Sequence, residues 1–293
     1  MRKILQFSAM LALISTPVTA RDILFIGNSF TFGNLSAARQ FQVDTVHDLN
    51  GPNAAGRTFG GVPAIFKAMT KEAGLDYNVS LEAVGGKGLD FHYREKLPLI
   101  DRRWDDVVLQ SYSTLDADKP GDPTVLVKYA ALLADTFTAR NPKANVYLTA
   151  TWSRADLTYP GGKPWSGKPI EQMALDVADG YEAAFKATPK AAAVIPVGLA
   201  FNRAFAAGFA DTNPYDGIAA GQVNLWAFDN YHASTFGYYL EALMIFGKVT
   251  GRDPLSLGDH EMVGDDFGFS PAQIHALQQI AHDELAAHQP SKP

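Results

Sequence analysis

The sequence predicts a single doubly wound α/β domain around a parallel sheet of about five strands. Short continuous apolar runs recur along the chain, and runs of this kind are typical of strands buried on both faces. Segments with helical spacing separate these runs, as expected where helices connect parallel strands by right-handed crossovers. No internal repeat, low-complexity tract or linker divides the chain, so we expect one domain over residues 21–293.

The predicted strands each lead into a turn that carries Gly, Ser or Trp. They are Ile23–Ile26, Val79–Val84, Val107–Leu109, Val146–Ala150 and Ala193–Val197. The predicted helices are Val62–Ala73, Pro123–Arg140, Pro169–Lys186, Ser234–Val249 and Ser270–His288. Ser234 and Ser270 stand where an N-cap is expected, and Gly251 stands where the fourth helix should end.

Two irregular segments, Asn50–Gly61 and Thr151–Lys168, interrupt this alternation. Ligands of doubly wound sheets bind beyond the carboxyl ends of the strands, and the second segment directly follows a predicted strand. Trp152 in that segment is therefore a candidate for stacking on a substrate such as a sugar ring. The alternative is a loop held in place by its own aromatic side chains.

The first twenty residues resemble a secretory signal peptide. Arg2 and Lys3 precede a short apolar stretch, and Val18-Thr19-Ala20 supplies small residues at the expected cleavage site. The apolar stretch is short for a membrane span, although a retained anchor is the alternative. We therefore expect export to the periplasm or the extracellular space, without stable membrane insertion.

Composition narrows the functional classes. Cleavage after Ala20 leaves 273 of 293 residues and removes two positive charges, which takes the formal charge from −6 to −8. This acidity argues against a nucleic-acid partner or an anionic membrane surface. The chain has no cysteine, which excludes disulfides, a thiolate nucleophile and cysteine-ligated metals.

Ser29 is the candidate nucleophile. It follows the first predicted strand, and Gly27 permits a tight turn before it. A helix that began near Ser29 would direct backbone N–H groups at the side chain and at a developing oxyanion. The alternative is a serine that only caps this helix.

Asp229 and His232 are the candidate acid and base. One turn of helical structure would place both side chains on one face, so that the carboxylate orients the imidazole and leaves its second nitrogen for a serine. The alternative is an Asp–His pair that ties down a loop. The chain order Ser, Asp, His is that of serine hydrolases built on an α/β sheet.

Together, Gly27-Asn28-Ser29 and Asp229-Asn230-Tyr231-His232 resemble the two end motifs of the SGNH, or GDSL-type, hydrolase superfamily. Asn28 stands where the family more usually has aspartate. The resemblance runs from Ile23 to about Gly251. It implies a flavodoxin-like, three-layer α/β/α fold and ester hydrolysis through an acyl-serine, with no metal or organic cofactor.

The same resemblance implies three oxyanion donors. Ser29 supplies the first through its N–H, and the glycine-rich loop after the second strand supplies another, with Gly88 the first choice and Gly86 the second. The family's G-x-N-D motif is missing, and Gln110 stands in its place. Its side-chain amide could replace the usual asparagine; the alternative is a polar residue at the end of a strand.

Other histidines offer competing assignments. His92 follows the glycine loop and is a candidate to line the substrate pocket or replace His232 as base, or else a surface or helix-capping residue. His260 stands among acidic residues that could bind a divalent metal, namely Asp259, Glu261, Asp265 and Asp266. That segment lacks the H-E-x-x-H spacing, and an acidic loop is the simpler interpretation.

The sequence therefore predicts an exported serine esterase whose substrate is a small-molecule or carbohydrate ester, for example an O-acetylated polysaccharide. Short-chain lipids and thioesters are the alternatives within this class. A binding protein that keeps the fold without turnover, and a metal-dependent hydrolase, are the alternatives outside it. The sequence does not indicate an oligomeric state.

Overall fold

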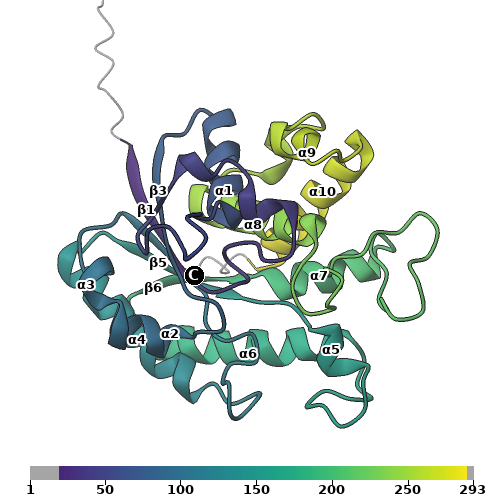
Figure 1. Cartoon of the computed structure of the whole chain (residues 1–293), viewed down its shortest axis with the longest axis horizontal. Helices are drawn as coiled ribbons and strands as arrows, with labels where there is room; N and C mark the ends of the chain where they lie inside the picture. Colours follow the sequence, from purple (N-terminus) through teal and green to yellow (C-terminus); the bar gives the residue numbers. More distant parts are fainter. Residues whose placement is uncertain (1–19, 289–293) are drawn as a thin grey trace, which may run out of the picture.

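The computed structural model describes residues 20–288, and its centre is one parallel sheet (Figure 1). Its six strands are β1 (Arg21–Gly27), β2 (Val46–Asp48), β3 (Tyr77–Ala83), β4 (Asp106–Leu109), β5 (Asn145–Ala150) and β6 (Ala191–Pro196). They lie in the order β2-β3-β1-β4-β5-β6, and every neighbouring pair is parallel. The predicted parallel α/β architecture is confirmed, with one strand more than expected.

Helices cover both faces of the sheet. The α-helices are α1 (Gly61–Glu72), α2 (Leu89–Glu95), α3 (Leu97–Ile100), α4 (Thr124–Arg140), α5 (Ala155–Thr158), α6 (Glu171–Ala187), α7 (Val197–Ala206), α8 (Thr235–Thr250), α9 (Met262–Asp266) and α10 (Pro271–Ala287). Three short 3₁₀ helices are η1 (Ala37–Gln40), η2 (Val43–Thr45) and η3 (Pro254–Leu257). All five predicted helices are present, within two residues at each end.

Strand β1 is apolar at successive positions because both of its faces are buried. Ile23 and Phe25 pack into one core with α1, α7, α8 and α10, whereas Leu24 and Ile26 pack into a second core with α2, α4 and α6. Successive side chains of a strand point to opposite faces, so a strand between two helical layers is apolar at every position. Figure 1 shows α1 and α8 on one side of the sheet and α2, α4 and α6 on the other.

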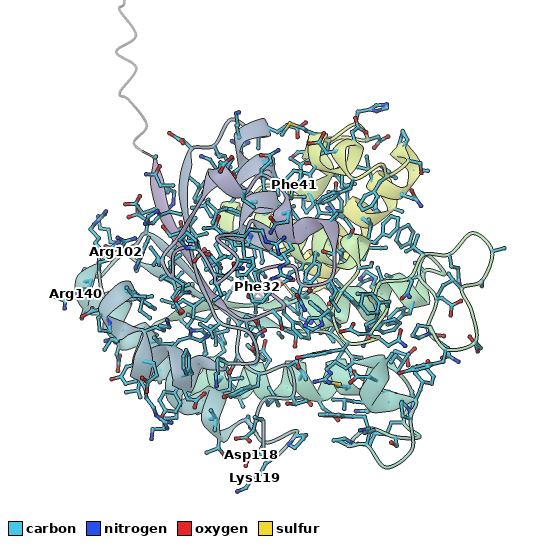
Figure 2. All side chains as sticks on the ribbon, in the orientation of Figure 1. Phe32, Phe41, Arg102, Asp118, Lys119 and Arg140 are labelled. Atoms are coloured by element: carbon cyan, nitrogen blue, oxygen red, sulfur yellow. The ribbon has the colours of Figure 1, made fainter. Side chains whose placement is uncertain are left out.

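Most charged side chains lie outside these cores, although Glu82, Asp106, Glu241, Glu261 and Glu284 are buried. In Figure 2, Phe32 lies near the middle of the molecule, while Arg102, Arg140, Asp118 and Lys119 lie at its periphery. Phe32 is 7% exposed. Within residues 20–288, every helix is either too short or too polar to cross a membrane.

The carboxyl end of β1 is the natural location for a site in this fold. The chain leaves β1 to form β3 on one side of it and then β4 on the other. The connections on the two sides diverge at this position, and a crevice opens there in doubly wound sheets. Ser29 is the second residue after β1.

The predicted caps of α8 and α10 are present in the structure. The Ser234 hydroxyl accepts from the N–H of Gly237 at the start of α8, and Gly251 ends that helix in the left-handed conformation at φ 68°. Ser270 forms a capping box with Gln273 at the start of α10, whose first residue is Pro271. These predictions are confirmed.

Candidate active site

Ser29 lies in a tight turn at the end of β1, and no helix begins there. The carbonyl of Asn28 accepts from the N–H groups of Thr31 (3.0 Å) and Phe32 (3.1 Å), and the next α-helix begins only at Gly61. The expectation that a helix begins near Ser29 is therefore wrong. A side chain at Gly27 would collide with the hydroxyl of Thr31, so the turn requires glycine for close packing rather than for an unusual φ.

Asn28 joins three loops beneath this turn. Its Nδ2 donates to the carbonyls of Lys87 (2.9 Å) and Ser111 (3.1 Å), and its Oδ1 accepts from the N–H of Phe30 (3.1 Å). An ionised aspartate has no N–H to donate, so it could not bond to both carbonyls. The departure from the family's usual aspartate therefore has a physical reason in this chain.

The structure brings Ser29, His232 and Asp229 together. His232 Nε2 lies 2.9 Å from Ser29 Oγ, and His232 Nδ1 lies 2.6 Å from Asp229 Oδ2. Ser29 and His232 are buried, at 7% and 6% exposure. Neither distance exceeds the range of a normal hydrogen bond, so one imidazole bridges the hydroxyl and the carboxylate.

Asp229 is held as the charged member of this arrangement. Burial opposes its ionisation, but hydrogen bonds from the ring and the backbone of His232 and from the N–H of Tyr231 keep the pKa of Asp229 below its usual value. Asn230, the next residue, has φ 56°, a left-handed conformation that asparagine tolerates better than most residues. An ionised Asp229 accepts a hydrogen bond from the Nδ1–H of His232 and leaves Nε2 to accept one from the Ser29 hydroxyl.

Aromatic rings surround the imidazole. The Tyr231 ring centroid lies 4.1 Å from that of His232, and the Phe30 centroid lies 5.6 Å from it. Trp152 Nε1 donates to the carbonyl of Tyr231 (3.2 Å), so the segment after β5 holds the loop of the histidine. The N–H of Asp156 adds a bond to the carbonyl of Asn230 (3.1 Å).

Gln110 does not direct its amide into the site, which corrects its assignment as an oxyanion donor. Its Oε1 accepts from the N–H of Asn28 (3.2 Å) and the hydroxyl of Thr31 (3.1 Å), and its Nε2 donates to the carbonyl of Ser111. The side chain is 1% exposed. It supports the turn of Ser29 from beneath.

The glycine loop also differs from expectation. Gly88 is buried as the N-cap of α2, and a side chain there would collide with the Tyr112 ring. Gly86, the second choice, is exposed at φ 72° and lines the same cavity as Asn28, the residue before Ser29. Gly86 therefore replaces Gly88 as the better candidate for an oxyanion donor from this loop.

Two predicted pocket residues lie in the protein interior instead. Trp152 is fully buried between the rings of Phe30 (4.4 Å) and Phe201 (5.0 Å), so it cannot stack on a substrate. His92 is also fully buried, with Nδ1 2.5 Å from Glu82 Oε2, and is neither a surface residue nor a partner of Ser29. Both assignments to substrate binding are wrong.

The residues around His260 do not form a metal site. His260 is exposed and lies 3.8 Å from Asp265, while Asp259 pairs with His275 and Glu261 caps α9. Residues 20–288 contain no group of three or more His, Asp or Glu side chains arranged to hold a metal ion. A hydrolase centred on His260 therefore has no ligand set in this part of the chain.

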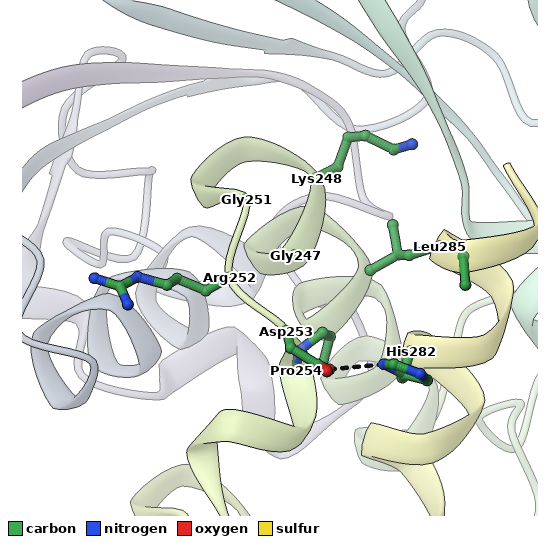
Figure 3. A pocket seen from close by; sticks show the side chains of 9 residues that line it. Gly247, Lys248, Gly251, Arg252, Asp253, Pro254, His282 and Leu285 are labelled. Carbon is green, nitrogen blue, oxygen red and sulfur yellow. Dashed lines mark hydrogen bonds and ion pairs between the residues drawn. The ribbon is translucent and has the colours of Figure 1, made fainter. Parts of the chain in front are cut away.

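One cavity is lined by Asn28 and Tyr231, the chain neighbours of Ser29 and His232. It has a volume of about 210 Å³ and is lined by Asn28, Gly86, Tyr112, Ser113, Thr114, Ala117, Arg154 and Tyr231. A larger cavity of about 340 Å³ lies between the end of α8 and α10, where His282 bonds to Asp253 (Figure 3). Its walls contain neither the candidate catalytic residues nor their chain neighbours, whereas the smaller cavity is lined by Asn28 and Tyr231.

Sequence reasoning missed Arg154 and Tyr231. Arg154 is the first charged residue after β5, at the carboxyl edge of the sheet. This position could have identified it as a candidate site residue. Tyr231 precedes the candidate base, but its contact with the imidazole depends on the fold of the loop.

No protein-family model matches this sequence, and no curated protein has a significant sequence match to it. Solved structures do match. A candidate SGNH hydrolase from Slackia heliotrinireducens is 23% identical at a TM-score of 0.51, covering 79% of this chain and 100% of that chain. A DUF4886 family protein from Bacteroides uniformis is 16% identical at a TM-score of 0.59, covering 94% and 98%.

A third match is LAE5, an α/β hydrolase from the metagenome of Lake Arreo, Spain. It is 16% identical at a TM-score of 0.51, covering 80% of this chain and 97% of that chain. Identities this low establish architecture rather than activity. By its sheet topology and these matches, the chain has the fold of the SGNH hydrolases.

Proposed function

We propose that this protein is a serine esterase that hydrolyses a carboxylic ester through an acyl-serine intermediate. The observation that supports it most strongly is the arrangement of one imidazole between Ser29 Oγ and Asp229 Oδ2, at 2.9 and 2.6 Å. Serine needs a base to remove its proton, and that base needs an acid to hold its tautomer. The site supplies both.

In this mechanism, Ser29 Oγ attacks the ester carbonyl and His232 Nε2 takes its proton. Asp229 stabilises the imidazolium, which then protonates the departing alkoxide. The N–H of Ser29 has no protein acceptor among residues 20–288 and can bind the oxyanion together with the N–H of Gly86. Water activated by His232 then attacks the acyl-serine and releases the acid.

The proposed substrate carries a small acyl group, such as an O-acetyl group on a carbohydrate. The cavity lined by Asn28 and Tyr231 has a volume of about 210 Å³, below the roughly 300–1,000 Å³ of pockets that hold drug-sized ligands, so it leaves little room for a long acyl chain beside the alcohol portion of the ester. We expect initial rates to fall from acetyl through butyryl to octanoyl esters. A preference for octanoyl esters would favour lipid hydrolysis instead.

The nucleophile can be tested directly. Ser29→Ala should abolish hydrolysis of p-nitrophenyl acetate, and a fluorophosphonate probe should label the wild-type protein at Ser29. Ser256→Ala in η3 is the matched control and should keep both properties. Near-normal turnover by Ser29→Ala would remove Ser29 as the nucleophile.

A binding protein without turnover is the second candidate, because Gln110 does not supply the expected side-chain donor to an oxyanion. Loss of one such donor typically lowers the rate by roughly 10²–10³. The fluorophosphonate experiment separates the candidates, since labelling of Ser29 requires an activated hydroxyl.

Export is part of the proposal and rests on residues 1–20, of which 1–19 lie outside the described part of the chain. Expression in a bacterial host with secretion should yield a protein that begins at Arg21. Mass spectrometry of the purified protein checks this, and an intact Met1 in the exported fraction would contradict it.

A further inference from the structure

Arg154 lies where it can touch a substrate. It follows β5, its side chain is 16% exposed, and it lines the same cavity as Asn28 and Tyr231, whose ring centroid lies 4.1 Å from that of His232. Its Nε and Nη2 donate to the two carboxylate oxygens of Asp156, at 3.0 and 2.6 Å. The guanidinium carbon lies 3.7 Å from the centroid of the Tyr231 ring. Two groups therefore fix the position of the guanidinium plane.

The third nitrogen of this guanidinium remains available. Nη1 lies 3.5 Å from Ser113 Oγ, beyond the 2.7–3.2 Å of a well-formed N–H···O bond. Ser113 is buried, and its hydroxyl has no other hydrogen bond within residues 20–288. Nη1 and Ser113 thus form a pair of weakly used donors on one wall of the cavity.

The charge around Arg154 favours a neutral oxygen over an anion. Asp156 balances the guanidinium charge through two hydrogen bonds, and the carboxylate of Asp229 belongs to the same loop as Tyr231. A substrate carboxylate would therefore be repelled by these acids while meeting a cation that is already paired. A hydroxyl or carbonyl oxygen accepts from Nη1 without this repulsion.

We infer that Nη1 of Arg154, with the hydroxyl of Ser113, binds a neutral oxygen of the substrate's alcohol portion, as a sugar hydroxyl would supply. This inference rests on the proposed esterase function and makes Arg154 a determinant of specificity for oxygen-rich alcohols. The contact is separate from Ser29, His232 and Asp229, so it should affect substrate choice more than the chemical step.

The test compares a mono-O-acetylglucose with phenyl acetate, whose alcohol portion has no oxygen beyond the ester. Arg154→Met keeps much of the apolar stem and removes every donor. It should lower kcat/KM for acetylglucose at least about tenfold more than for phenyl acetate, mainly through KM. Equal losses on both substrates, or no loss on either, would overturn the inference.

Arg140→Met is the matched control. Arg140 makes a similar bidentate ion pair with Asp101, at 2.8 and 2.7 Å, but it lies at the exposed end of α4. This variant should leave both substrates unaffected. A fall in the acetylglucose-to-phenyl-acetate ratio with Arg140→Met would show that the ratio does not report on the cavity.

Binding without turnover distinguishes this inference from the proposed function. In the Ser29→Ala background, calorimetry should show that Arg154→Met weakens binding of acetylglucose at least about tenfold. That result supports the contact even if the wild-type protein hydrolyses neither ester, which would refute only the esterase. Unchanged binding would refute the role of Arg154.

Discussion

Asp229 contacts His232 at two places through its two carboxylate oxygens. Oδ1 accepts from the backbone N–H of His232 at 3.0 Å, and Oδ2 lies 2.6 Å from the ring nitrogen Nδ1. Oδ1 also accepts from the N–H of Tyr231 at 3.1 Å. One oxygen therefore shapes the loop, while the other orients the imidazole.

This division predicts the effect of Asp229→Asn. The amide oxygen of asparagine can keep the loop bonds of Oδ1, but its NH₂ group would face Nδ1 and favour the wrong tautomer of His232. We expect kcat to fall by roughly 10³–10⁴ with little change in melting temperature. Asp229→Ala should lose both activity and stability; a similar loss of stability in the two variants would contradict the separate roles.

Gln110→Met tests whether this side chain supports the turn or binds the oxyanion. The substitution removes the acceptor of the Asn28 N–H and the Thr31 hydroxyl, so unfolding free energy should fall by about 1–3 kcal/mol. The kcat should fall by less than the roughly 10²–10³ that follows loss of an oxyanion donor. Urea denaturation and ester kinetics check this, and the reverse pattern would restore Gln110 to the oxyanion hole.

Gly88 and Gly86 should respond differently to alanine. At Gly88 a Cβ collides with the Tyr112 ring, so Gly88→Ala should cost about 2–3 kcal/mol of stability. At Gly86 an added Cβ would meet no atom within 4 Å among residues 20–288 other than its chain neighbours, and the cost at φ 72° should be about 1 kcal/mol. Tyr112→Ala should partly rescue Gly88→Ala in a double-mutant cycle; strict additivity would exclude the collision.

Glu241 should make stability depend on pH. This carboxyl on α8 is 2% exposed, Oε2 has no hydrogen-bond partner in the described residues 20–288, and burial raises the pKa of Glu241 well above 4.5. A raised pKa in the folded state means that folding favours the protonated form. Stability should therefore fall as pH rises from about 4.5 through the folded pKa.

Glu241→Gln removes this titration. We expect it to stabilise the protein by more than about 1 kcal/mol at pH 8, because one pKa unit corresponds to about 1.4 kcal/mol, with a smaller gain at pH 5. Glu95→Gln, at the exposed end of α2, is the control and should show no pH-dependent gain. Unfolding free energies measured at pH 5 and pH 8 test this prediction. An equal gain in stability at both pH values would exclude ionisation of Glu241 as its cause.

Sequence reasoning missed β2, α7 and the short helices α2, α3, α5 and α9. Two of these elements, β2 and α7, lack a local signal. β2 is a three-residue edge strand, Val46-His47-Asp48, with one apolar residue, and its pairing with β3 defines it. α7 continues directly from β6 after Pro196, without a polar cap or a break in the apolar run. In both cases tertiary contacts select the backbone conformation.

The sequence by itself determined the parallel α/β architecture and the candidates Ser29, Asp229 and His232. Burial on two faces requires apolar residues at every position of a strand, and an activated serine requires a base and an acid. Because both requirements restrict the residue types, both can be recognised in the sequence. Tertiary structure alone decided the neighbours of Gln110, Trp152, His92 and Arg154. The direction of an amide, the burial of a ring and the free edge of a guanidinium depend on which distant segments pack against them, here Thr31, Phe201, Glu82 and Asp156.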